Sequence, residues 1–295
     1  MKLKYIGTPA DLGGTAVPGC GTIHKSEIRD TLLDLSKALA LPFDLNDYSL
    51  GSVGKREYSG DIDLVIDDEW WSEGVTAFRQ KLEDKFGKDN VARNGDMLHL
   101  KFPITDYDSS LHYAQPRTGF VQVDFMFGNP KWKQFYHYSD EHSEYKGAHR
   151  NLMMAAICSE LNVHPFYSDT DSIVWEGDRP ASIIRWKWGS NGLIQVNRHS
   201  VKDKHGHWKQ KQEDTVLAGP YTDPQTIAMI LFPSAQSENV FYSMESIMQA
   251  VKDNYGMVDC ERVWRRSARN FYDWSQGRLF EYPSEIAAYL PPKDK

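Results

Sequence analysis

Two aspartates separated by one residue, Asp61 and Asp63, have the clearest capacity for chemistry in this chain. The segment 61–66 is otherwise aliphatic, which predicts a largely buried strand. Because side chains alternate across a strand, both carboxylates leave it on the same face. Like charges held side by side at a buried position are costly unless a cation lies between them. The pair therefore predicts a site for a divalent metal ion.

A glycine-rich turn precedes this strand. Gly51, Ser52 and Gly54 allow the backbone to curl tightly and to expose N–H groups. Lys55 and Arg56 add positive charge beside the turn. The alternative for the whole segment is a surface turn followed by a strand with two solvated aspartates.

The order Gly51-Ser52, eight residues, then Asp61-Ile62-Asp63 resembles the signature of the nucleotidyltransferase superfamily of DNA polymerase β. The local sequence is most similar to the family-X polymerases, in which Gly-Ser-x-x-Arg precedes Ser-Gly-Asp-x-Asp. This chain has Ser59-Gly60 before its aspartates and is one spacer residue shorter. The resemblance covers about residues 24–160. It implies a palm domain, a mixed sheet with flanking helices.

A third carboxylate is expected at Asp124. The segment 119–127 predicts a strand with residues 121, 123, 125 and 127 on one face and Gln122, Asp124 and Met126 on the other. The superfamily completes its metal site with an acid between hydrophobic residues on a neighbouring strand, and the resemblance assigns that place to Asp124. The alternative is an aspartate at a strand edge that faces solvent.

Residues 135–157 carry a second, weaker part of the resemblance. Family-X polymerases continue from the third carboxylate into a tyrosine-rich turn and a helix whose Asn and Arg face the nucleotide and the template. Tyr138, with Tyr136 as the other register, would take the tyrosine position, and Arg150 the arginine position. Lys146 stands where the family has Asn, which is a departure. A core helix built on apolar residues explains the same segment.

The resemblance implies two Mg²⁺ ions, with Mn²⁺ as a substitute, held by Asp61, Asp63 and Asp124. Asp124 would hold the ion on the nucleophile side and help to deprotonate the attacking hydroxyl. The Gly51-Ser52 turn would cradle the β- and γ-phosphates, which Lys55 or Arg56 would neutralise. The expected reaction moves a nucleoside monophosphate from an NTP or dNTP to a hydroxyl, with release of pyrophosphate.

The acceptor is open at this point. A nucleic-acid 3′ end, of tRNA or DNA, is favoured by two basic stretches. The first, residues 179–211, has eight Lys or Arg and one acid, and the second, residues 262–278, has five Arg and one acid. The net charge of −7 argues against a protein that coats nucleic acid. The alternatives are a protein or small-molecule acceptor, synthesis of a nucleotide second messenger, and a non-catalytic binding protein.

Length and composition indicate an ordinary globular α+β protein. The chain has 295 residues, 40% hydrophobic and 25% charged, with no apolar run that could span a membrane and no signal-peptide pattern. Three well-separated cysteines indicate a reducing, cytoplasmic location without disulfides or a zinc site. We expect an extended leader over 1–23, the palm domain over 24–168 and a second α+β domain over 169–295.

Helical spacing predicts helices over 24–39, 70–86, 224–232, 244–251 and 263–274. Strands are expected at 48–50, 91–104 and, around a hairpin turn, 183–196, with a further turn and strand at 202–208.

Overall fold

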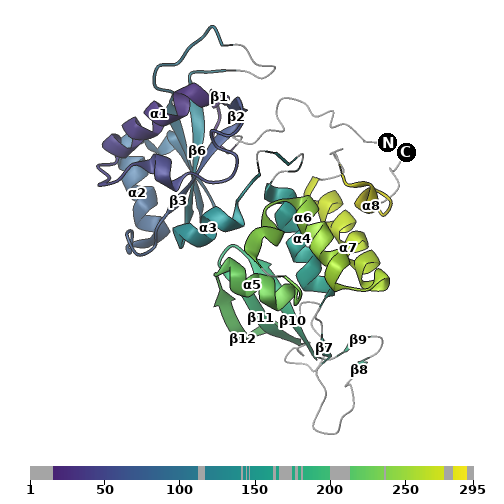
Figure 1. The fold of residues 1–295 in the computed structure, drawn as a ribbon. Helices are drawn as coiled ribbons and strands as arrows, with labels where there is room; N and C mark the ends of the chain where they lie inside the picture. Colours follow the sequence, from purple (N-terminus) through teal and green to yellow (C-terminus); the bar gives the residue numbers. More distant parts are fainter. Residues whose placement is uncertain are drawn as a thin grey trace. The chain divides into compact units, whose positions relative to one another are not determined.

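A computed structural model (Figure 1) describes residues 16–111, 117–140, 142, 143, 145, 147–161, 164, 165, 175, 176, 179, 180, 182–199, 213–235, 237–275 and 282–290. The chain divides into two compact units, one within Tyr5–Gly147 and one within Ala148–Lys295. Both units combine helices with a sheet, so the α+β class is confirmed. Among the described helices, none has the length and apolar character that crossing a bilayer requires.

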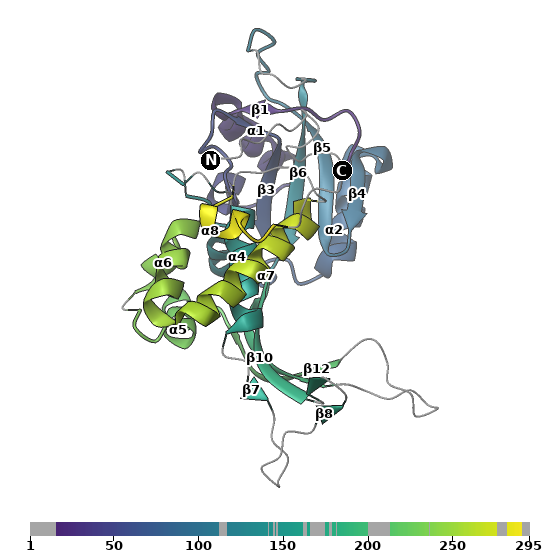
Figure 2. The ribbon, with the colours of Figure 1, turned by 90° about the vertical axis from the view of Figure 1, so that its right-hand side faces the viewer.

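The first unit is built on a mixed four-stranded sheet in the order β3-β6-β5-β4, which can be followed in Figure 2. The strands are β3 (Asp61–Ile66), β4 (Val91–Asn94), β5 (Met97–Pro103) and β6 (Phe120–Phe127). β3 pairs with β6 in parallel, and the other neighbours are antiparallel. A short antiparallel pair joins β1 (Ile23–His24), just before α1, to β2 (Tyr58–Ser59), just before β3.

One face of this sheet is the hydrophobic core. The helices α1 (Lys25–Ala38) and α2 (Gly74–Phe86) supply apolar residues that cluster with those of the strands. The alternation predicted for residues 119–127 is confirmed, because Val121, Val123 and Phe125 are fully buried in this core. The aliphatic residues of β3, 62 and 64–66, are likewise fully buried.

The other face carries the polar residues in two rows across three strands. Register pairs Asp63 of β3 with Asp124 of β6 and Asp124 with His99 of β5. The neighbouring row joins Asp61, Gln122 and Lys101 in the same way. A small apolar cluster of Leu50, Val65 and Met126 belongs to the next row along. The same alternation that buries the core therefore gathers the polar groups on one surface.

Local sequence sets the ends of the helices in this unit. α1 begins with a capping box, in which the His24 side chain accepts the N–H of Ser26 and Glu27 accepts the N–H of His24. The predicted helix over 24–39 is confirmed, and the strand expected over 91–104 is present as the two hairpin strands β4 and β5. The helix predicted from residue 70 begins later, at Gly74.

Two elements differ from the sequence expectation. The strand expected at 48–50 is a 3₁₀ helix, η2 (Leu45–Tyr48), followed by an isolated bridge from Ser49 to Leu64. Asp44 caps η2 by accepting the N–H of Asn46, and this turn chemistry outweighs the β preference of the segment. A helix not predicted, α3 (Pro130–Tyr136), begins at an Asn129 cap. A second short 3₁₀ helix, η3 (Lys88–Asn90), leads into β4.

The second unit contains an antiparallel sheet in the order β12-β11-β10-β7 and several helices (Figure 1). The strands β10 (Ser182–Gly189) and β11 (Gly192–His199) form the predicted hairpin, and β7 (His164–Pro165) and β12 (Glu213–Tyr221) flank it. A separate two-stranded pair joins β8 (Trp175–Glu176) to β9 (Arg179–Pro180). The turn and strand expected at 202–208 lie outside the described residues.

The helices of this unit are α4 (Gly147–Glu160), α5 (Pro224–Leu231), η4 (Glu238–Phe241), α6 (Met244–Asn254), α7 (Met257–Ser275) and α8 (Ser284–Ala287). The three helices predicted after residue 220 are confirmed. Trp264 and Phe271 of α7 are buried, whereas Trp274 is 42% exposed.

The division between the units precedes the boundary that we expected after residue 168. The reason is the packing of α4, which the sequence analysis placed at the end of the first domain. Ser267 of α7 contacts Met153, Asn270 donates to the carbonyl of Leu152, and Phe271 packs on His149. The buried face of α4 therefore forms its core with α7.

Phe78→Ala should lower the free energy of unfolding by about 3–5 kcal/mol, because it leaves a cavity in the core of the first unit. Phe78 is fully buried, with ring centroids 5.2 Å from Phe125 and 5.5 Å from Phe127. Urea unfolding measures the change. Leu33→Ala, at a residue 37% exposed on α1, is the control and should cost less than about 1 kcal/mol. Equal effects of the two substitutions would contradict this core.

Candidate active site

The structure brings Asp61, Asp63 and Asp124 onto one face of the sheet. Asp63 and Asp124 are register partners on the parallel strands β3 and β6, and Asp61 lies two residues earlier on β3. Side chains at partner positions leave the sheet on the same side. Asp124 is 6% exposed, and the other two are partly buried. The predicted alternative, an edge aspartate in solvent, is wrong for Asp124.

The electrostatics of Asp63 reflect this crowding. Burial raises the pKa of Asp63 well above its ordinary value, and the charges of Asp61 and Asp124 raise it further. Each of these effects disfavours the ionised carboxylate. A cation close to the carboxylates would offset the repulsion between their charges and favour the ionised form.

Asp124 is held by two neighbours that the sequence analysis did not assign to the site. The Nδ1 atom of His99 lies 2.8 Å from Oδ1 of Asp124, and Nε2 of Gln122 donates to the same oxygen at 2.8 Å. All three side chains are buried. The alternation of residues along β6 predicted that Gln122 lies on the same face as Asp124. His99 lies beside these two residues only because β5 pairs with β6 in this register.

The Gly-Ser turn lies directly beside Asp63. The N–H of Leu50 donates to the carbonyl of Asp63 at 2.9 Å, which fixes the start of the turn on β3. Gly51 has a φ of 64°, a conformation that side chains disfavour, and a Cβ there would lie 3.6 Å from Oδ2 of Asp63. The turn is therefore placed to bring backbone groups close to the carboxylates.

Lys55 and Tyr138 meet beside the turn. The Lys55 ammonium donates to the carbonyl of Ser139 at 2.8 Å and lies 4.5 Å from the centre of the Tyr138 ring. These contacts join the turn to the segment after α3 within the first unit. Arg56, the other cation predicted at the turn, is exposed.

Two predicted nucleotide-binding residues are not placed in this site. Lys146 lies outside the described residues. Arg150 belongs to the second unit, where it is 3% exposed and donates from Nη1 to the carbonyl of Phe241 at 2.9 Å. These contacts give Arg150 a place in the packing of the second unit, and its nucleotide-binding role stays a prediction.

The donor set fits a hard divalent cation. Carboxylate oxygens are the ligands that Mg²⁺ and Mn²⁺ take in proteins, and here the charges of two carboxylates raise the pKa of a third. Among the described residues, no group of three His, Cys, Asp or Glu side chains is arranged so that it could hold a metal ion as the side chains stand, and this includes the three aspartates. Asp61, Asp63 and Asp124 would hold the ion, and Ser52 and Lys55 lie on the turn beside them.

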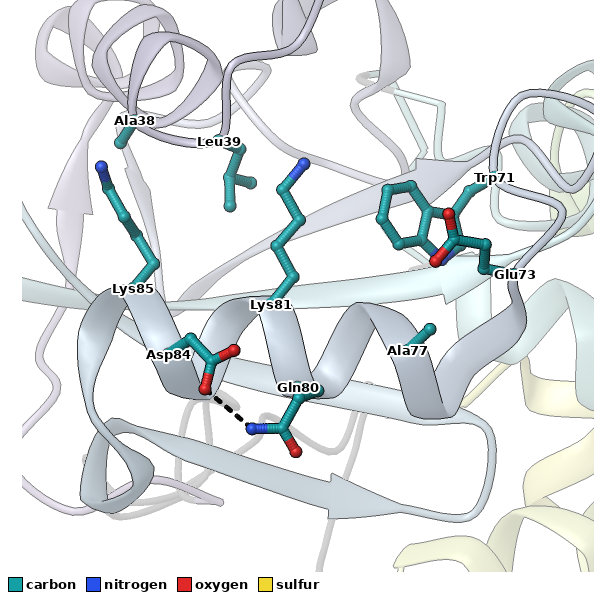
Figure 3. A pocket seen from close by; sticks show the side chains of 9 residues that line it. All are labelled: Ala38, Leu39, Trp71, Glu73, Ala77, Gln80, Lys81, Asp84 and Lys85. Carbon is teal, nitrogen blue, oxygen red and sulfur yellow. Dashed lines mark hydrogen bonds between the residues drawn. The ribbon is translucent and has the colours of Figure 1, made fainter.

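A separate hollow of about 620 Å³ lies on the other side of the sheet, between the end of α1 and α2 (Figure 3). Lys81 and Lys85 of α2 extend toward Ala38 and Leu39 of α1, and the Lys81 ammonium lies 5.0 Å from the centre of the Trp71 ring. Because α1 and α2 cover the core face, this hollow is distinct from the carboxylate face.

The basic stretches of the second unit are largely paired with acids. On α7, Arg265 lies 2.8 Å from Glu261, and Arg262 lies 3.2 Å from Asp259. Arg198 and Lys187 both bond Asp214, which lowers the pKa of that carboxyl. Residues 202–211 and Arg278 lie outside the described residues. The described part of these stretches is therefore less available to a polyanion than the sequence alone indicated.

Comparison with known proteins finds distant likeness among solved structures. No protein-family profile and no curated protein matches the chain. A solved structure of Leishmania infantum polymerase beta, in a ternary P/T complex, is similar with a TM-score of 0.35 and 13% identity. The match covers 74% of this chain and 76% of that one. A likeness of this size carries no weight for function, which rests on the residues described above.

Asp63→Asn should raise the melting temperature of the metal-free protein at neutral pH, because it removes a carboxylate that burial and two like charges disfavour. The folded chain binds the Asp63 proton more tightly than the unfolded chain does. The free energy of unfolding therefore falls as the pH rises from 3.8, the ordinary pKa of an aspartate, through the raised pKa of Asp63. The increase in melting temperature that Asp63→Asn gives over the wild type should therefore vanish near pH 4 and below.

Thermal unfolding in EDTA over a pH series measures this effect. Asp96→Asn, at a side chain 95% exposed, is the control and should leave the melting temperature unchanged. If Asp63→Asn lowers the melting temperature at neutral pH, the carboxylate is favourably paired in the folded chain and this electrostatic description is wrong.

Proposed function

We propose that this chain is a metal-dependent nucleotidyltransferase that moves a nucleoside monophosphate from an NTP or dNTP to a hydroxyl, with pyrophosphate leaving. The register that sets Asp63 beside Asp124, with Asp61 on the same face, is the observation that carries the proposal. The Gly51 turn against Asp63 adds backbone donors for phosphate at the same place. A carboxylate group next to a phosphate cradle fits phosphoryl transfer better than any other reaction class considered.

The residues take different parts in this reaction. Ser52 and the N–H groups of the turn orient the β- and γ-phosphates, and Lys55 or Arg56 balances their charge. Mg²⁺ bound by the carboxylates would supply charge neutralisation at the phosphates and lower the pKa of the attacking hydroxyl. Asp124 is the carboxylate that accepts the hydroxyl proton. Positioning and charge compensation provide most of the rate in sites of this kind.

The acceptor that we propose first is a nucleic-acid 3′ end. Arg185, Lys187 and Arg198 lie near one another on the β10–β11 hairpin, where Asp214 bonds both Lys187 and Arg198. Burial, together with the charge of Arg198, lowers the pKa of Arg185. Such a concentration of positive charge favours a polyanion. The acid partners of the α7 arginines weaken the same inference, so a protein or small-molecule hydroxyl is the second candidate.

Incubation with Mg²⁺ and each α-³²P-labelled NTP or dNTP, with tRNA, primed DNA or cell lysate as acceptor, tests the reaction and separates the acceptors. Label on nucleic acid supports the first acceptor and label on protein the second. Small cyclic or linear products would indicate a second-messenger synthase. Absence of transfer to every acceptor, together with absence of nucleotide and Mn²⁺ binding, would contradict the proposal.

Asp61→Asn and Asp124→Asn should each lower the transfer rate by more than about 100-fold, because each removes a carboxylate from the proposed metal site. The measurement is single-turnover label transfer at saturating Mg²⁺. Asp96→Asn is the matched control, because the Asp96 side chain is exposed on the turn between β4 and β5. This variant should transfer label at the wild-type rate. Wild-type rates in both carboxylate variants would remove the metal assignment.

A further inference from the structure

Gln122 links the N-terminal segment to Asp124. The Oε1 atom of Gln122 accepts the backbone N–H of Ala16 at 2.9 Å and of Val17 at 3.1 Å. Its Nε2 atom donates to Oδ1 of Asp124 at 2.8 Å. Gln122 is 2% exposed, and its bonds with Val17 and Asp124 are buried, whereas the bond from Ala16 is partly buried.

These partners fix the orientation of the Gln122 amide. Turning the amide over would set its NH₂ group against two N–H donors and its carbonyl against the carboxylate of Asp124. The turned amide would lose all three hydrogen bonds in a buried place, where an unpaired polar group costs about 1–3 kcal/mol. The N-terminal segment therefore decides that a donor, and not an acceptor, faces Asp124.

His99 supplies the second donor. Its Nδ1 lies 2.8 Å from the same Oδ1 atom of Asp124, and its Nε2 is buried without a hydrogen-bond partner among the described residues. An ionised carboxylate only accepts hydrogen bonds, so Nδ1 of His99 is the donor toward such a carboxylate. Both donors end on Oδ1, which leaves Oδ2 as the oxygen available to the site.

The N-terminal segment is itself well anchored. Val17 is 2% exposed and Ile23 is fully buried in the core. The N–H of Gly21 donates to the carbonyl of Phe120 at 2.8 Å, and Ile23 pairs with Ser59, two residues before Asp61. The segment 16–24 thus runs from the strand of Asp124 to the residues that lead into Asp61.

We propose that Gln122 and His99 are positioning residues, and that the segment 16–24 acts through Gln122, so that together they set the direction of the Asp124 carboxylate for cation binding. The purpose assigned to Asp124 rests on the proposed function. The hydrogen-bond geometry described above does not depend on that function.

The substitutions that separate the roles are Gln122→Met, which removes the donor and the acceptor, and His99→Leu, which removes the ring nitrogens. His99→Asn keeps an N–H donor near the position of Nδ1 and is the conservative partner.

Mn²⁺ affinity, measured by EPR on the full chain without nucleotide, tests this inference. Gln122→Met and His99→Leu should each weaken Mn²⁺ binding by about 10–100-fold, whereas His99→Asn should stay within about threefold of wild type. Wild-type affinity in both donor-removing variants would overturn the inference, and so would equal weakening by Asn and Leu at position 99.

Thermal unfolding of each variant shows whether it is folded, and if Gln122→Met does not fold, the His99 pair decides the question. Failure of the wild-type chain to bind Mn²⁺ would overturn this inference, and together with absence of nucleotide binding and label transfer it would overturn the proposed function as well. Binding by the wild type with unaffected variants would overturn this inference alone.

Discussion

The repulsion among three carboxylates on one sheet face is the interaction on which the rest of the first unit depends. Burial disfavours the ionised form of Asp63, and the charges of Asp61 and Asp124 add to that effect. A chain that holds these charges together must stabilise the sheet from elsewhere. The opposite face does this, because Leu64 of β3 and Val123 and Phe125 of β6 are fully buried in the core that α1 and α2 help to form.

The two faces are produced by one physical rule. The period of two along β3 and β6 sends alternate residues to the core and to the polar face, and parallel pairing puts Asp63 level with Asp124. A shift of one residue between these strands would separate the carboxylates, and a flip of either strand would bury them in the core. The hydrophobic core therefore fixes the geometry of the polar site as well as the stability of the sheet.

The sequence was sufficient for those parts of the site that depend on local patterns. Alternation within single strands predicted the common face of Asp61 and Asp63 and the separation of Asp124 from the apolar residues of its strand. The positive φ of Gly51 follows from the residue itself. The Asn129-Pro130 pair was also a helix-start signal in the sequence, although the helix that it begins was not predicted.

The remaining parts depend on contacts between residues far apart in the chain. His99 reaches Asp124 only through the pairing of β5 with β6, and Gln122 is oriented by backbone groups 105 and 106 residues earlier. Arg150 looked like a ligand-binding arginine from its place in the chain, but its contact with Phe241 depends on the packing of the second unit. Register and tertiary packing of this kind are not encoded in any local window.

A crystal structure of the protein grown with Mn²⁺ and a non-hydrolysable nucleoside triphosphate analogue tests the central claim most directly. The account predicts anomalous scattering peaks within about 2.0–2.3 Å of carboxylate oxygens from Asp61, Asp63 and Asp124, with the β- and γ-phosphates at the Gly51-Ser52 turn. Manganese bound elsewhere, or a triphosphate that does not contact this turn, would contradict it.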